Sequence, residues 1–309
     1  MVALVALLLI IAACLLAPAY AQWAGVDPFS STLDATIKID GQDVPVMEQS
    51  TEGLGLGYNP IDPTWQLGNY FLGADNQGRD VMARLLYGGI NSFLIAGAAT
   101  ILTLAGATIL GLASGFFGGA IDTMISRFLD VLWAFPVYLL AISLSIVLIA
   151  QGISIGPITI ESGSLWLPIF IIGIIYIPYV ARPIRGQVMS LRKSEFVMAA
   201  IGLGAPSSRI LLREILPNVS TTLIVFVPLM MAINMLTESA LSYLSIGVQP
   251  PDASWGTIIQ DGQGLLYTRP VVSLAPGIAI VLTVLALNVL GDGLRDALDP
   301  RSKIKIGGR

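Results

Sequence analysis

The stretch LLYGGINSFLIAGAATILTLAGATILGLASGFFGGAI, residues 85–121, contains no charged side chain. A helix of about 20 apolar residues is long enough to cross the hydrocarbon core of a bilayer. Five further charge-free runs meet the same requirement, at residues 1–26, 131–160, 162–181, 215–237 and 270–291. The sequence therefore predicts an all-α membrane protein with six transmembrane helices, near residues 2–21, 90–117, 129–150, 165–185, 218–245 and 271–291.

The composition agrees with this class and excludes several functions. Only 12% of the 309 residues are charged, against about 25% in soluble domains. The chain has no histidine, which excludes Ser-His and Cys-His catalysis and any histidine metal ligand. It has no Gly-Lys dipeptide and so lacks the phosphate-binding loop of an ATPase. A net charge of −4 without a basic stripe argues against nucleic-acid binding. The sequence predicts neither an enzyme nor a metal site.

The distribution of lysine and arginine predicts the orientation, because positively charged loops stay in the cytoplasm. Residues 22–78 hold eight acidic side chains and one basic one, Lys38, so this segment is predicted to be external. Residues 182–218 hold six basic side chains, and the tail after residue 291 holds five more. Both are predicted to be cytoplasmic, which places the N-terminus inside as well.

The first span has a second reading as a signal peptide. Ala19-Tyr20-Ala21 fits a cleavage site, and the residues before Cys14 resemble a lipoprotein box. No basic residue precedes Lys38, however, whereas a secretory signal normally opens with positive charge. An uncleaved helix is favoured, and both readings place residue 22 onward outside. The external segment itself is either a docking surface for a soluble partner or a solvated insertion.

The predicted cytoplasmic segment 186–217 reads GQVMSLRKSEFVMAAIGLGAPSSRILLREILP. An apolar patch around Phe196 ends at Gly204, and a second amphipathic turn follows. A short helix–glycine–helix element of this kind cannot bury its apolar side alone. It fits either a groove on a partner protein or the lipid interface.

This segment resembles the cytoplasmic signature of the permeases of binding-protein-dependent ABC importers, which is E-A-A, three residues, G, nine residues, then I-x-L-P. The resemblance is to the second permease of the dipeptide/oligopeptide/nickel group. Two positions depart from the signature: Met198 replaces its acidic residue, and Glu214 stands at an apolar position. Glu195 is close but does not align. The residues in register are Met198, Ala199, Ala200, Gly204, Leu216 and Pro217.

Four other stretches resemble the same family, in the same order along the chain. They are Leu72–Asp80, Arg127–Asp130 leading to Phe135-Pro136, Glu238–Gly247 followed by Val248–Pro251 and Ser254–Gly256, and Asn288–Asp296 followed by Asp299-Pro300. The similarity runs from about residue 70 to 301 and does not explain residues 22–69. The chain is accordingly divided into a first transmembrane helix (1–21), an external polar segment (22–88), a core permease domain (89–301) and a cytoplasmic tail (302–309).

The resemblance implies an ATP-driven importer in the cytoplasmic (inner) membrane. The chain would form the translocation pathway with a second, similar permease, and an external solute-binding protein would deliver the substrate. Two ATPase subunits would carry ATP and Mg, with no cofactor in this chain. The coupling segment would comprise Glu195, Met198, Ala199, Ala200, Gly204, Leu216 and Pro217.

A secondary transporter and a non-transport assembly protein are the alternative functions. Peptides are favoured over nickel because a metal pathway would use histidine or cysteine ligands, and Cys14 lies in the peripheral first span.

Polar residues within or beside the spans are the remaining candidates. Asp130 is predicted to pair with Arg127 one turn earlier, and Pro136 has a structural role. Glu238 either lines a hydrated pathway or bonds to a neighbouring helix. The pathway or interhelical candidates are Asn234, Glu238, Gln249 and Trp255.

Overall fold

The computed structural model describes residues 1–39, 41–49, 57–155, 158–161 and 163–298. The chain divides into two compact units. The first unit contains Met1–Ile95, Ser145–Pro168 and Met235–Ala286, and the second contains Ala96–Leu144, Ile169–Asn234 and Leu287–Arg309. Each unit is built from segments that are far apart in the sequence, and the long helices contribute residues to both.

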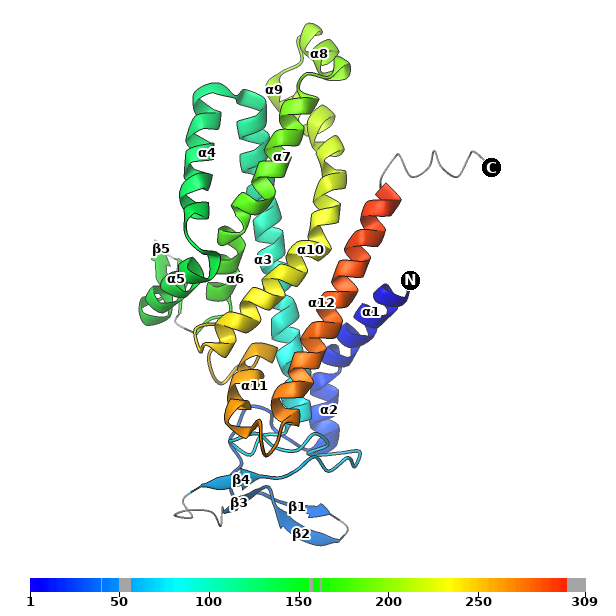
Figure 1. Ribbon diagram of the computed structural model, residues 1–309, viewed down its shortest axis with the longest axis vertical. Helices are drawn as coiled ribbons and strands as arrows, with labels where there is room; N and C mark the ends of the chain where they lie inside the picture. The colour runs from blue at the N-terminus through cyan, green and yellow to red at the C-terminus, as the bar shows by residue number, and fades with distance from the viewer. Residues whose placement is uncertain (40, 50–56, 156–157, 162, 299–309) are drawn as a thin grey trace, which may run out of the picture. The chain divides into compact units, whose positions relative to one another are not determined.

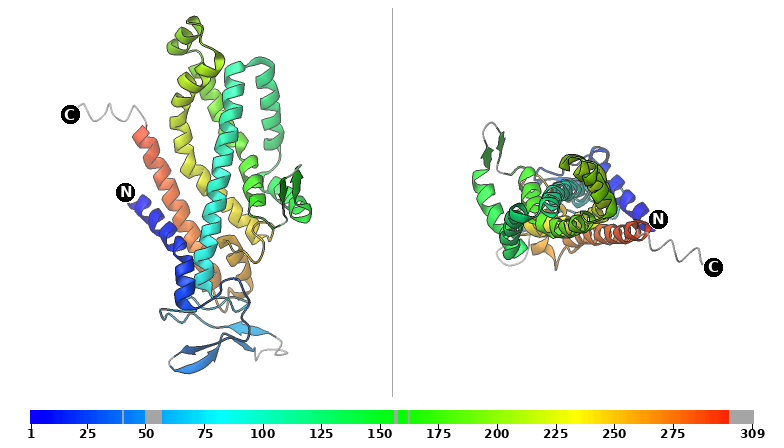
Figure 2. Two further views of the ribbon diagram at one scale, coloured as in Figure 1. Left: turned by 180° about the vertical axis from the view of Figure 1, so that it is seen from behind. Right: turned by 90° about the horizontal axis from the view of Figure 1, so that it is seen from above.

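Three helices are long and apolar enough to cross a membrane singly. They are α3 (Val81–Phe117), α10 (Leu216–Tyr243), which continues a helical run from Ser207, and α12 (Val271–Leu298). Figures 1 and 2 show α3 as one continuous helix. Its 37 residues span about 55 Å at 1.5 Å per residue, more than the roughly 30 Å of hydrocarbon core. α3 begins at Val81, ahead of the predicted start of the span at residue 90.

The other three spans are bent pairs of helices, which bring the total to six among the described residues. α1 (Val2–Leu15) and α2 (Ala17–Ala24) meet at 48°, α4 (Gly119–Ala134) and α5 (Val137–Gln151) at 87°, and α6 (Trp166–Ile175) and α7 (Ile177–Leu191) at 41°. Pro136 lies at the break between α4 and α5, and Pro18 and Pro178 lie in the first turn of α2 and α7, directly after the other two breaks. Proline lacks the N–H that a helix interior needs and disfavours helical geometry in the residue before it. The all-α, six-span fold class is confirmed, but the helices predicted as single at 2–21, 129–150 and 165–185 are each broken, most sharply at Pro136.

Glycines on α3 let the α7 backbone approach closely within the second unit. A Cβ atom added at Gly111 would lie 2.7 Å from Ile184 Cγ2, and one added at Gly115 would lie 2.7 Å from Val188 Cβ. Real side chains cannot come that close. Small residues at helix contacts are the usual way in which membrane helices pack.

The segment predicted to be external is folded. β1 (Thr36–Ile39) pairs antiparallel with β2 (Gln42–Pro45), and β3 (Met47–Gln49) pairs with β4 (Tyr58–Pro60). A small core lies beneath these hairpins, made of Ile37, Val46, Met47, Tyr70 and Ala74. Figure 1 shows the strands β1 to β4 of these two hairpins. Both belong to the first unit, as does a third hairpin, β5 (Ile153–Ile155) with β6 (Ile158–Ile160). The segment is thus a subdomain with its own core rather than a plain connector.

Candidate functional site

The predicted coupling segment forms the expected helix–glycine–helix element in the second unit. α8 covers Glu195–Gly202, a short α9 covers Ser207–Arg209, and the π-helical turn η1 (Ile210–Ile215) runs directly into α10. Gly204 takes a left-handed conformation with φ +77°, which side chains rarely adopt. The N–H groups of Gly204 and Ala205 donate to the carbonyl oxygens of Ile201 and Ala200, at 2.9 and 3.1 Å. These bonds end α8 and turn the chain toward α9.

Most apolar residues in and directly after α8 are uncovered by this chain. Val197 is fully buried, whereas Phe196, Met198 and Ile201 are 42–56% exposed and Leu203 is 88% exposed. Of the other signature residues, Glu195, Ala199 and Gly204 are exposed and Ala200 is half-buried. Leu216 and Pro217 open α10, directly after the buried Ile215. The element is anchored through Val197 and leaves its other large apolar residues open, as both the partner-groove and the lipid-interface readings require.

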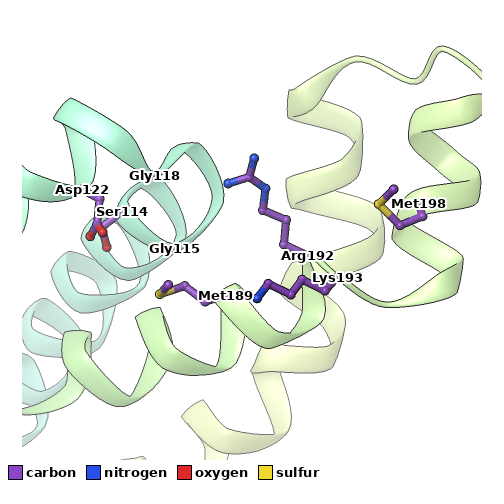
Figure 3. Close-up of a pocket in the computed structure, with 8 residues that line it drawn as sticks. All are labelled: Ser114, Gly115, Gly118, Asp122, Met189, Arg192, Lys193 and Met198. Atoms are coloured by element: carbon purple, nitrogen blue, oxygen red, sulfur yellow. The ribbon is translucent and has the colours of Figure 1, made fainter.

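A cavity of about 480 Å³ lies beside α8 and is lined by the ends of α3 and α7 and the start of α4. Figure 3 shows Arg192 and Lys193 in this cavity, with Met198 coming from α8 and Ser114 and Asp122 from the α3–α4 side. Asp122 accepts two bonds from the Arg185 guanidinium, at 2.5 and 2.6 Å. This two-bond ion pair ties the start of α4 to α7, so the wall of the cavity is fixed.

The predicted partner of Asp130 is wrong. The structure pairs Asp130 with Arg182 of α7 at 2.9 Å rather than with Arg127 on its own helix. Arg182 also lies over the ring of Trp133, with 5.6 Å between the guanidinium carbon and the ring centroid. Pro136 lies at the sharp break between α4 and α5.

Glu238 is fully buried and joins three helical segments of the first unit. Its carboxylate accepts hydrogen bonds from Ser92 of α3, at 3.1 Å, and from Ser242 one turn further along α10, at 2.7 Å. Ser92 Oγ also accepts the backbone N–H of Trp255, the first residue of α11 (Trp255–Asp261), at 3.1 Å. These contacts support interhelical bonding, and no surface of Glu238 is left for a hydrated pathway in this structure.

The other three polar candidates differ in what they contact. Asn234 Nδ2 donates to Thr100 at 3.0 Å, while its buried Oδ1 has no partner in the described part of the chain. Trp255 is 1% exposed; its Nε1 donates to the carbonyl oxygen of Leu85, and its ring meets Phe93 edge-on. Gln249 is half-buried and lines a second, polar cavity of about 320 Å³ in the first unit.

Beside that second cavity lies a buried cluster of four charges. Arg79 Nε bonds Asp75 at 2.7 Å, and the terminal nitrogens of Arg79 and Arg84 each bond Asp261 Oδ2 at 2.9 Å. Asp75, Arg79 and Arg84 are at most 5% exposed and Asp261 is 17% exposed. Burial raises the pKa of the Asp261 carboxyl, although both guanidinium groups work against the shift. The cluster joins the Leu72–Asp80 stretch to α11.

Local geometry explains why these residues meet. Asp80 caps α3 by accepting the backbone N–H of Ala83 at 2.8 Å, and its burial raises its pKa. α11 opens with a capping box in which Ser254 and Thr257 each accept the backbone N–H of the other. Sequence reasoning missed Arg84 and Asp261 as site residues. The available signal was that each stands alone next to an apolar run.

No group of three or more His, Cys, Asp or Glu side chains that could hold a metal ion occurs in the described part of the chain.

Comparison with known proteins identifies the class. Residues 107–304 match the family model of the binding-protein-dependent transport system inner membrane component. A dipeptide transport system permease protein, DppC of Alkalihalophilus pseudofirmus, is 38% identical over 234 residues, 76% of this chain and 73% of its own. The oligopeptide transport system permease protein OppC of Haemophilus influenzae is 37% identical over 241 residues, 78% of this chain and 73% of its own. The glutathione transport system permease protein GsiD of Pectobacterium atrosepticum is 37% identical over 235 residues, 76% of this chain and 73% of its own.

A solved structure shows the same fold. The inward-facing MetNI methionine ABC transporter matches with a TM-score of 0.56 at 15% identity, covering 71% of this chain and 98% of that one.

The chain belongs to the family of inner membrane components of binding-protein-dependent transport systems. It is an integral, multi-pass membrane permease rather than an enzyme, and the predicted resemblance to the peptide-permease group is confirmed.

Proposed function

We propose that this chain is one of two permease subunits of an ATP-driven importer for dipeptides and oligopeptides in the cytoplasmic (inner) membrane. The relatives named for dipeptide, oligopeptide and glutathione transport support this substrate class. The observation that carries this proposal is the exposure of the large apolar residues in and directly after α8, in a segment that stands in register with the family signature. Two ATPase subunits, which bind ATP and Mg, would cover it. A similar permease would complete the pathway, and a soluble binding protein would deliver the peptide.

The connection from α8 to the span supplies a route for coupling. The run from Ser207 through η1 and α10 is helical throughout, so α9 is continuous with a transmembrane helix. Val197 on α8 and Ile210 and Ile215 on η1 are nearly fully buried, and they anchor α8 on this run. A ligand shifts a two-state equilibrium only through its different affinities for the two states. The groove that holds α8 must therefore move when ATP binds, and α10 moves with it.

The test is reconstitution of the whole transporter in liposomes with its cognate binding protein. We expect ATP-dependent uptake of a labelled dipeptide and no uptake without ATP. Nickel accumulation without peptide uptake would reverse the substrate assignment. Uptake driven by an ion gradient in the absence of ATP would favour a secondary transporter.

Orientation is tested separately by labelling single cysteines introduced at Ser208 and Ser31 into a Cys14→Ser background. We expect a membrane-impermeant reagent added outside intact cells to label position 31 and to leave position 208 unlabelled. Labelling of position 208 from outside would overturn the topology.

A further inference from the structure

The loop between β4 and α3 contains an uncharged stretch within an acidic segment. Residues 63–73 read PTWQLGNYFLG and carry no charge, whereas residues 22–78 as a whole hold eight acidic side chains. Two large apolar side chains of this stretch are exposed, Trp65 at 63% and Leu67 at 88%. Exposed apolar side chains that gather on one segment mark a contact with a protein or with a membrane.

The loop from residue 64 to residue 71 is held in one conformation by bonds across its base. The backbone N–H and the hydroxyl of Thr64 both donate to the carbonyl oxygen of Tyr70, at 3.3 and 3.0 Å. The backbone N–H of Trp65 donates to the carbonyl oxygen of Phe71 at 3.3 Å, and the two rings meet edge-on with their centroids 5.6 Å apart. Tyr70 is 5% exposed and belongs to the small core beneath the hairpins. Leu67 is therefore displayed by a loop of defined shape, which is anchored in the core of the subdomain.

A hydrogen bond sets the level of this loop relative to the first span. The Tyr20 hydroxyl of α2 donates to the carbonyl oxygen of Gly68 at 2.8 Å. The apolar run of the span ends at this point, because Gln22 is the first amide or charged side chain of the chain. Trp23 follows, is 64% exposed, and has its ring centroid 6.1 Å from that of Tyr20. Tyrosine and tryptophan gather where a span leaves the membrane, since their rings are apolar and their tips polar. Leu67, the neighbour of Gly68, therefore lies at the level of the lipid headgroups.

The exposed apolar surface of the first span continues onto the loop. Leu15 and Leu16, at the bend between α1 and α2, are 65% and 61% exposed, and the exposed Trp23 lies near the end of α2. Figure 1 shows the chain between β4 and α3 beside that end of α2, where Tyr20 bonds Gly68. This continuity selects lipid as the occupant. A soluble partner meets the external subdomain from the water side, whereas this loop lies level with the end of a transmembrane helix.

We propose that the 64–71 loop is a membrane anchor, with Leu67 and Trp65 inserted into the headgroup region of the external leaflet beside Trp23. The leucine exchanges contact with water for contact with acyl chains, and the indole ring has the mixed apolar and polar character that suits this region. The lack of charge in residues 63–73 fits this role, because a charged side chain would oppose insertion. The anchor holds the external subdomain, and with it the entry to α3, against the bilayer. It acts in the same way whichever solute the transporter carries.

The test uses the complete transporter in lipid nanodiscs, with a nitroxide attached at position 67 of a Cys14→Ser, Leu67→Cys variant. Power-saturation EPR measures collisions of the nitroxide with oxygen, which dissolves in lipid, and with a nickel chelate, which stays in water. The matched control carries the nitroxide at position 42 through Gln42→Cys, on an exposed residue of β2. We expect the ratio of oxygen to nickel-chelate collisions to be higher at position 67 than at position 42. Adding Tyr20→Phe, which removes the hydroxyl bond to Gly68, is expected to raise nickel-chelate collisions at position 67 and to leave position 42 unchanged.

Three results overturn the inference. Nickel-chelate collisions at position 67 that are as frequent as at position 42 place the loop in water. A nitroxide at position 67 that neither reagent reaches assigns the loop to a contact with the second permease. Nickel-chelate collisions that disappear only when the binding protein is added make the loop a docking surface for that protein. Peptide uptake enters none of these measurements, so the proposed function stands or falls separately.

Discussion

The α8 element and the buried charge cluster differ in how completely this chain satisfies them. On α8, Phe196, Met198 and Leu203 leave apolar surface uncovered. In the cluster, Asp75 and Arg79 are nearly inaccessible, and every charge has an oppositely charged partner. An uncovered apolar side needs a second body, whereas a paired and buried cluster needs none. The first is therefore a surface for coupling to another subunit, and the second is an anchor internal to the fold.

The largest loss of stability is expected when one charge is removed from the cluster. We expect Arg84→Met to destabilise the protein by about 3–5 kcal/mol, because it leaves Asp75 and Asp261 with an uncompensated buried negative charge. The measurement is thermal unfolding of the detergent-solubilised protein.

The matched control is Arg269→Met. Arg269 pairs with Asp62 at 3.0 Å, but its side chain is 22% exposed and that of Asp62 is 68% exposed. An exposed pair contributes about 0–1 kcal/mol, and the bond from Arg269 Nε to the carbonyl oxygen of Pro60 about 1 kcal/mol more, so the control is expected to lose clearly less stability than Arg84→Met. Equal losses in the two variants would show that the cluster is no more important than a surface pair.

The opposite expectation holds at α8, where a charge at Ala200 should harm function and leave the stability of the permease unchanged. Ala200→Glu and Gly204→Asp are each expected to uncouple ATP hydrolysis from uptake, because an unpaired polar group in an apolar contact costs about 1–3 kcal/mol. Gly204→Asp also strains a backbone with φ +77°, so a loss of stability is expected for that variant, and Ala200→Glu carries the assignment. Hydrolysis and peptide uptake are measured together in proteoliposomes.

Ala297→Glu and Gly293→Asp are the controls for these two variants. They make the same changes at exposed positions near the end of α12, where nothing lies within 4 Å of a Cβ added at Gly293. Both are expected to transport normally. Normal transport by Ala200→Glu and Gly204→Asp, at normal expression, would falsify the coupling assignment.

The sequence predicted the apolar part of this architecture well and its polar contacts poorly. Charge-free runs locate spans because the bilayer itself imposes the length, and Gly204 ends α8 because few other residues adopt its conformation. The break at Pro136 could have been predicted, since proline interrupts helices whether or not the run is apolar. The partner of Asp130 could not. Spacing along one helix pointed to Arg127, whereas Arg182 comes from α7 and only the packing of α4 on α7 brings it close.

Two glycines of α3 test where this helix is closely packed within the second unit and where it is not. Gly111→Ala would place a Cβ atom 2.7 Å from Ile184 Cγ2 and 3.1 Å from the carbonyl oxygen of Ala181. We expect a loss of about 1–2 kcal/mol, because the cost of overpacking exceeds the helix-propensity gain of alanine. Gly97→Ala, on the same helix with nothing within 4 Å of its Cβ, is expected to gain about 0.5–1 kcal/mol. Unfolding temperatures that move in the same direction would contradict this packing.

The smallest effect is expected at the ion pair between Asp130 and Arg182. Both side chains are well exposed, at 62% and 44%, so water competes for the charges and Asp130→Asn should cost at most about 1 kcal/mol. Asp122→Asn is the comparison, because Asp122 is 18% exposed and accepts two bonds from Arg185. Removing the charge of Asp122 weakens two charge-assisted bonds in a less solvated place. The unfolding temperature of Asp122→Asn should therefore fall further than that of Asp130→Asn. Raising the salt concentration should reduce the difference in unfolding temperature between wild type and Asp130→Asn more than that between wild type and Asp122→Asn, since exposed charges are screened most. A larger loss at Asp130 than at Asp122 would mean that Asp130 is covered in the assembled transporter, and that α4 contributes to a surface that a partner completes.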